Sequence, residues 1–164
     1  MKVKDIAIIG MLSAIMVAAQ FSLSFLPNIE LVSLLIIMYT LVFGWRALYI
    51  IYVFVIIEGL IYGFGLWWFS YLYIWLILYI ITRLFHKARS PLHWAIISGA
   101  YGLSFGALYS IVVIITSGIQ GGLASWVQGI PFDIAHCAGN FAVTLILFKP
   151  LYFILNKLKL QLED

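Results

Sequence analysis

Charged residues are scarce in this sequence. Only 9% of its 164 residues are Asp, Glu, Lys or Arg, whereas 65% are hydrophobic. A soluble domain carries far more polar surface, so this composition excludes an ordinary soluble domain and favours the membrane class. The single cysteine, Cys137, allows no internal disulfide and is too isolated to indicate a metal site.

Basic residues are absent from three of the five loops that join the apolar segments. We place these segments at 6–25, 31–43, 47–64, 67–85, 94–116 and 123–148. All nine Lys and Arg fall before the first segment, between the second and third, at the end of the fourth or between it and the fifth, or after the sixth. Loops that carry Lys and Arg stay in the cytoplasm. The sequence therefore predicts an all-α integral membrane protein, a single domain of six transmembrane helices over residues 1–164, with both termini cytoplasmic.

The second apolar segment is short for a membrane-spanning helix, which needs about 20 residues. It should be tilted, be shielded by its neighbours, or begin within residues 26–30. Pro27 and the pair Gly121-Gly122 indicate turns on the outer side. We expect Pro150 to break the sixth helix, and residues 151–164 to form a helical extension at the cytoplasmic surface.

Motifs typical of enzymes and nucleotide-binding proteins are also absent. The sequence contains no phosphate-binding G-x-x-x-x-G-K-[ST] loop, no H-E-x-x-H and no G-x-S-x-G. The basic residues are scattered along the chain, which disfavours nucleic-acid binding. We therefore expect no enzyme activity, no cofactor, no metal ion and no nucleic-acid partner.

Polar residues deep within the apolar segments predict a binding site. Glu58, Asp133, His136 and Asn140 fall in the outer halves of their segments, and the last three lie within about a 60° arc of one helix. A carboxylate in the membrane is costly and is functional by default. The alternative is that Asp133 and His136 pair with each other or cap a helix, while tyrosines hold Glu58. In the binding hypothesis Glu58 and Asp133 matter most, and Glu30 in the outer loop matters less.

Aromatic residues form a stripe along the fourth segment, since Trp68, Tyr71 and Trp75 recur at i, i+3 and i+7. Tyr62 lies near the end of the preceding segment. Trp68 fits an interfacial belt, but Trp75 lies too deep and is either lipid-facing or a stacking platform for a flat ligand. Two acids, one histidine and no deep Lys or Arg predict a flat, nitrogen-rich ligand that is neutral or cationic.

Small residues recur every four positions in the first segment, at Gly10, Ala14 and Ala18. Such a face lets another backbone approach closely. It could pack inside the bundle or dock another protein. A second stripe, which we expect to pack internally, consists of Ser98, Gly102 and Gly106.

Six short spans occur together with an Ala-x-x-x-Ala pair at Ala14 and Ala18, and with Pro-Asn-Ile-Glu-Leu at 27–31. Gly-Ile-Pro-Phe-Asp at 129–133 runs on to the polar residues of the sixth span. This combination resembles the substrate-binding S component of energy-coupling factor transporters, over nearly the whole chain.

The resemblance implies a subunit of the prokaryotic plasma membrane that captures a vitamin or related micronutrient from outside. Such a subunit docks through its alanine motif, here Ala14 and Ala18 with Gly10 on the same face, onto a membrane scaffold subunit that carries two ATPase subunits. Only those partners use ATP, and the captured ligand reaches the cytoplasm when the subunit topples in the membrane. The first outer loop is shorter than the gating loop of many members, so we expect residues 63–69 and 117–122 to close the pocket. The expected pocket residues are Glu58, Tyr62, Trp68, Tyr71, Trp75, Asp133, His136 and Asn140.

Two other classes remain open. A structural membrane protein of the cell-wall elongation machinery has a similar size and hydropathy, but it needs no polar pocket. A small proton-coupled carrier would use Glu58 and Asp133 as a relay, and it would normally show an internal repeat, which this sequence lacks.

Overall fold

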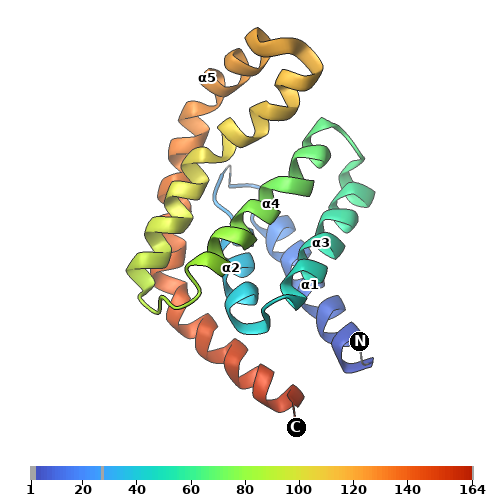
Figure 1. The fold of residues 1–164 in the computed structure, drawn as a ribbon, viewed down its shortest axis with the longest axis vertical. Coiled ribbons are helices and arrows are strands. Elements are labelled where there is room, and N and C mark those ends of the chain that lie inside the picture. The colour runs from blue at the N-terminus through green and yellow to red at the C-terminus, as the bar shows by residue number, and fades with distance from the viewer. Residues whose placement is uncertain (1–2, 27, 164) are drawn as a thin grey trace.

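The computed structural model describes residues 3–26 and 28–163, and this part of the chain is all-helical. The helices are α1 (Val3–Ser22), α2 (Val32–Phe43), α3 (Arg46–Tyr62), α4 (Leu66–Leu84) and α5 (Pro91–Glu163). Figure 1 shows α1 to α4 grouped beside the long hairpin that α5 forms. Pro27, expected in an outer turn, and Lys2, expected among the cytoplasmic residues, lie outside the described residues.

α5 combines the last two expected spans into one helical element. Its backbone leaves the helical conformation at Gly118, where φ is 77° and ψ is 172°, and the chain turns back there (Figure 1). A positive φ costs a glycine little. The prediction of six separate helices is therefore wrong: the described chain has five helical elements, and the expected loop 117–122 is helical on both sides of Gly118.

The expected break at Pro150 is also wrong, because α5 runs through it to Glu163. A proline removes one backbone hydrogen bond from a helix, and packing on both sides of Pro150 holds this helix together. Phe148 stacks on Tyr152 with ring centroids 5.8 Å apart, and Leu155 is buried one turn further on. The extension after Pro150 is thus helical, as expected, but continuous with the preceding helix.

α2 is the centre of the bundle. Every residue of this helix except Leu41 is buried, and α2 packs against α3, α4 and α5. Of the three explanations for its shortness, shielding by neighbouring helices is the one that its burial supports. Three other segments, Val3–Ser22, Leu66–Leu84 and Pro91–Gln161, are long and apolar enough to cross a membrane.

Large apolar side chains cover much of the surface. Ile115, Phe153 and Ile119 are each about 70% exposed or more, and exposed leucines, isoleucines and phenylalanines occur on every helix but α2. A soluble monomer rarely shows such extensive apolar surface. The apolar helices and their exposed faces are compatible with a helical membrane protein.

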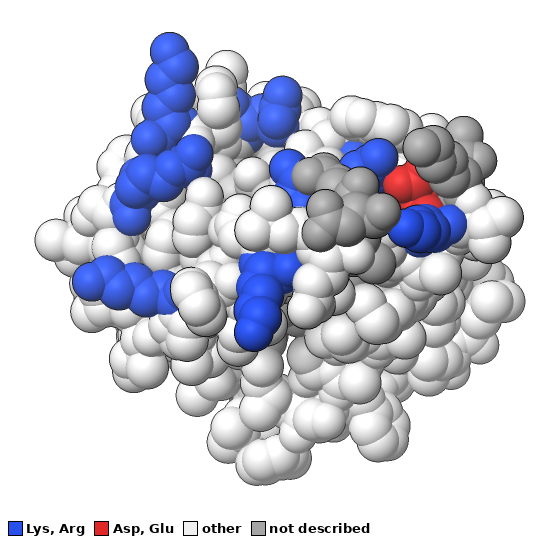
Figure 2. Space-filling model, turned by 90° about the horizontal axis from the view of Figure 1, so that it is seen from below, with Lys and Arg blue, Asp and Glu red and all other residues white. Residues whose placement is uncertain are grey.

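The basic side chains gather at one end of the bundle. Arg46 begins α3, Arg83 ends α4, and further Lys and Arg lie between α4 and α5 and near the end of α5. Figure 2 views this end of the molecule and shows the Lys and Arg side chains spread across it. We call it the basic end. The turn at Gly118 and the α1–α2 and α3–α4 loops lie at the opposite end (Figure 1).

The two arms of α5 touch through glycines. A Cβ atom on Gly102 would lie 2.9 Å from the carbonyl carbon and oxygen of His136, and one on Gly106 would collide with the Asp133 carboxylate. Ser98, on the same stripe, is fully buried. The expectation that this stripe packs internally is confirmed, and its close packing fixes residues 133–137 against the first arm.

Candidate functional site

A cavity of about 380 Å³ lies at the end of the bundle opposite the basic end. Helices α1, α3, α4 and α5 and the α1–α2 loop surround it. This volume is within the range of pockets that hold small organic ligands. Its lining residues are Gln20, Leu23, Ser24, Leu26, Asn28, Ile29, Glu30, Glu58, Tyr62, Trp67, Tyr71, Trp75, Phe105 and His136.

Glu58 supplies an unpartnered carboxylate to this cavity. It lies one turn before the end of α3 and is only 3% exposed. No described residue forms a hydrogen bond or an ion pair with it, although Tyr62 and Tyr71 line the same cavity. A buried charge without a partner is costly. The alternative in which tyrosines hold Glu58 is therefore not supported, and the carboxylate is free to bind a ligand.

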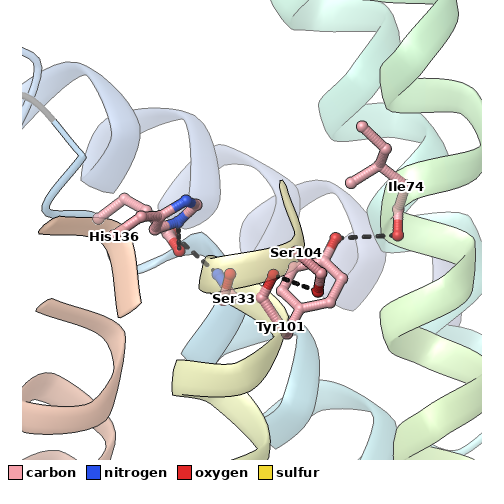
Figure 3. Close-up of polar contacts among 6 residues, drawn as sticks. Ser33, Ile74, Tyr101, Ser104 and His136 are labelled. Carbon is pink, nitrogen blue, oxygen red and sulfur yellow. Dashed lines mark hydrogen bonds and ion pairs between the residues drawn. The ribbon is translucent and has the colours of Figure 1, made fainter. Parts of the chain in front are cut away.

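Glu30 and His136 form the second polar feature of the wall. His136 Nε2 lies 3.2 Å from Glu30 Oε1, and the Ser33 backbone N–H donates to Glu30 Oε2 over 2.8 Å. Figure 3 shows these contacts at His136 and Ser33. Glu30 thereby satisfies a free N–H of the first turn of α2. Sequence reasoning gave Glu30 a minor role in a loop, whereas the structure places it in the cavity wall.

The charge state of Glu30 follows from these contacts. Burial raises the pKa of its carboxyl, but the interactions with His136 and the hydrogen bonds from Ser33 outweigh burial, so that the pKa lies below the usual 4.5. Hydrogen bonds to a carboxylate favour its ionised form. Glu30 is therefore an anion at neutral pH.

Trp75 anchors an aromatic wall. It is 3% exposed, so it is not lipid-facing, and its ring contacts Tyr71 and Phe105 with centroids 5.2 and 5.6 Å apart. Phe105 in turn meets the His136 ring at 5.0 Å. The Tyr101 hydroxyl donates to the Ile74 carbonyl over 2.9 Å and ties α5 to α4 beside this wall (Figure 3). Packed rings of this kind form a rigid apolar surface for a flat ligand.

Three of the expected pocket residues do not line the cavity. Trp68 Nε1 donates to the Val55 carbonyl over 2.9 Å. Asp133 accepts the Gly106 backbone N–H over 2.9 Å, and Asn140 is buried with its Nδ2 unpartnered among the described residues.

The helical rise explains why only His136 of the α5 group reaches the cavity. Asp133 and Asn140 share its helix face but lie about 4.5 and 6 Å from it along the axis, at 1.5 Å per residue. The predicted convergence of four polar residues is thus reduced to Glu58 and His136, with Tyr62, Tyr71 and Trp75 also in place. The described residues show no hydrogen bond between Asp133 and His136: Asp133 accepts from the Gly106 N–H, and His136 Nε2 faces Glu30.

The α1–α2 loop forms more of the wall than expected. Residues 117–122 supply none of the lining residues and 63–69 supply only Trp67, whereas the α1–α2 loop supplies Leu23, Ser24, Leu26, Asn28, Ile29 and Glu30. The loop is short but well anchored: a Cβ atom on Gly139 of α5 would lie 3.3 Å from the Asn28 carbonyl oxygen. The α1–α2 loop therefore lines the cavity although it is short.

The Gly10, Ala14 and Ala18 face is exposed rather than packed inside the bundle. A Cβ atom on Gly10 would meet nothing within 4 Å. Ala14 and Ala18 line a second, almost wholly apolar groove of about 380 Å³ between α1 and α3, with Val17, Phe21, Ile57, Ile61 and Tyr62. Of the two interpretations of this stripe, internal packing is not supported.

The described residues contain no cluster of three His, Cys, Asp or Glu that could hold a metal ion. Comparisons with family models, curated proteins and solved structures found no match to this chain. Its function must therefore be argued from the cavity and the groove.

Proposed function

We propose that this chain is the substrate-capture subunit of an uptake transporter in a prokaryotic plasma membrane. It binds a vitamin-like micronutrient with high affinity in the cavity, and a separate scaffold subunit with two ATPase subunits supplies the energy. The observation that carries this proposal is the Glu58 carboxylate, buried in an aromatic cavity without a described partner. Ligand binding would compensate the cost of burying it.

The charge of the cavity defines the ligand class. Glu58 and Glu30 supply two carboxylates, and Glu30 is paired with His136. No Lys or Arg of the described residues lines the cavity. An anion would meet net negative charge, whereas a flat nitrogen-rich heterocycle, neutral or cationic, could donate N–H groups to Glu58 and pack against the aromatic wall. The ligand therefore belongs to the class of aminopyrimidines, purines and related rings.

The position of the cavity supports capture from outside. With α5 crossing twice, the helices give six passes, and the basic end lies in the cytoplasm by the distribution of Lys and Arg. Both termini then lie inside, and the cavity lies in the outer half of the bundle. The bilayer covers the exposed apolar side chains.

The groove at Ala14 and Ala18 is the docking face for the scaffold. Small residues let a helix of another subunit approach closely, and membrane helices associate through such packing. A structural protein of the cell-wall machinery would use the groove but would have no role for an unpartnered Glu58. A proton-coupled carrier would need Glu58 but no docking face.

Mass spectrometry of small molecules that co-purify with the protein tests the proposal. Wild-type protein should retain a nitrogen-rich heterocycle, and Glu58→Gln should retain little of it. Asp133→Asn is the matched control, because Asp133 is a buried carboxylate outside the cavity whose hydrogen bond an asparagine oxygen can keep. Retention of only lipids and detergent by all three proteins would contradict the proposal.

A further inference from the structure

The contact between Glu30 and His136 leaves one ring nitrogen without a protein partner. His136 Nε2 lies 3.2 Å from Glu30 Oε1. Its Nδ1 has no hydrogen bond to any described residue, and His136 is buried and lines the cavity. The side chains of the pair are only 6% and 13% exposed, so little water competes with this contact.

When Glu30 is ionised, its carboxylate can accept hydrogen bonds but cannot donate one. Its Oε2 is already bound to the Ser33 N–H over 2.8 Å, and its Oε1 faces His136. The ring nitrogen that meets Oε1 must therefore carry the proton. In a neutral imidazole the other nitrogen then holds a lone pair.

We propose that Glu30 is a positioning residue that holds His136 as its Nε2–H tautomer, so that His136 Nδ1 is a second hydrogen-bond acceptor for the ligand beside Glu58. This inference rests on the proposed function. The cavity then selects a ligand with two N–H groups, one facing the Glu58 carboxylate and the other facing His136 Nδ1.

This assignment gives Glu30 an effect on specificity through His136, because its two carboxylate oxygens face Ser33 and His136. The orientation of the ring is fixed by Glu30 on one side and by Phe105 on the other, whose ring centroid lies 5.0 Å from that of His136. A group that hydrogen-bonds the second nitrogen of a histidine commonly sets its tautomer. An amino group on the ligand would be accepted at Nδ1, whereas a carbonyl oxygen there would face a lone pair and be rejected.

Nitrogen-15 NMR of histidine-labelled protein in lipid nanodiscs tests the tautomer without any ligand. The chain has three histidines, and the signals of His136 are those that His136→Asn removes. Wild-type protein should show a protonated Nε2 and an unprotonated Nδ1. In Glu30→Gln, whose amide can donate as well as accept, this preference should be lost. Glu58→Gln is the matched control in the same cavity and should leave the His136 signals unchanged.

Binding of adenine and hypoxanthine tests the consequence for specificity, because the amino group and unprotonated N1 of adenine are replaced by a carbonyl oxygen and an N1–H in hypoxanthine. Wild-type protein should prefer adenine, and Glu30→Gln should reduce that preference by roughly three- to tenfold, the value of one neutral hydrogen bond. In a His136→Ala background the same Glu30 substitution should have no further effect, because Glu30 acts through His136.

A protonated Nδ1 in wild-type protein, a doubly protonated ring at neutral pH, or an unchanged spectrum in Glu30→Gln would each overturn the inference and leave the proposed function standing. The inference would also be overturned if Glu30→Gln reduced the preference for adenine equally in the wild-type and His136→Ala backgrounds. The expected spectra together with no binding of either purine would instead support the tautomer and count against the proposed ligand class.

Discussion

Glu30 Oε1 lies 3.2 Å from His136 Nε2, although the two residues are 106 positions apart in the chain. This contact joins the α1–α2 loop to the second arm of α5 at the wall of the cavity. The loop also packs on Gly139, one turn further along α5. Access to the cavity therefore depends on how firmly this loop is held.

Substitution at Gly139 should loosen the α1–α2 loop. A side chain in Gly139→Val would enter the space of the Asn28 carbonyl and the Ile29 side chain, both 3.3 Å from an added Cβ. Residues 23–30 should then exchange their amide hydrogens faster, and ligand retention should fall. Gly129→Val is the control, because a Cβ atom there meets nothing within 4 Å. Equal exchange in both variants would show that the loop is not held at Gly139.

Acid should release the same loop. Because the pKa of Glu30 lies below 4.5 in the folded protein, its ionised form contributes stability that is fully present above pH 4.5 and is lost as the pH falls through the lowered pKa. The difference in thermal stability between wild type and Glu30→Gln should therefore be constant from pH 7 to about 5 and shrink below 4.5. A difference that vanishes between pH 7 and 6 would point to another group.

The alanine groove should govern assembly and not ligand binding. Ala18→Trp fills the groove, so it should abolish co-purification with a scaffold subunit and abolish uptake, while the isolated chain keeps its ligand affinity. Ile15→Trp, at an exposed position of α1 outside the groove, is the control. Unchanged assembly of the Ala18 variant would show that the groove is covered by lipid alone.

Membrane sidedness can be checked by cysteine labelling in intact cells, after replacement of Cys137. Ser90→Cys, in the exposed α4–α5 connection at the basic end, should react only after permeabilisation. Gln120→Cys, exposed beside the α5 turn, should react without it. The reverse pattern would invert the topology.

The all-helical, apolar class was predictable, because the composition and length of an apolar segment can be read from local sequence alone. The junction of the last two spans was less predictable: Gly118 reverses the chain without a proline or a loop, so helix continues on both sides of it. Pro150 was misjudged because stacking of Phe148 on Tyr152 outweighs the loss of one hydrogen bond.

The candidate site was predictable in part. Glu58, Trp75 and His136 were found because deep polar and aromatic residues are unusual in apolar helices. The role of Glu30 was missed because its partner lies in α5, far along the chain. One signal was present, since Glu30 stands three residues before Ser33 at the start of an apolar helix, a spacing typical of a carboxylate that caps its first turn.

Calorimetry of the purified chain against thiamine, adenine, 7-deazaguanine and pantothenate tests the central claim, that Glu58 binds a nitrogen-rich ligand in this cavity. At least one of the three heterocycles should bind tightly, and Glu58→Gln should weaken it roughly ten- to a hundredfold, the value of a hydrogen bond to a charged group. Asp133→Asn, to which sequence reasoning gave an equal effect, should change the affinity by less than about threefold, since the lost charge lies outside the cavity. Tight binding of the anion pantothenate, unaffected by Glu58→Gln, would contradict the account.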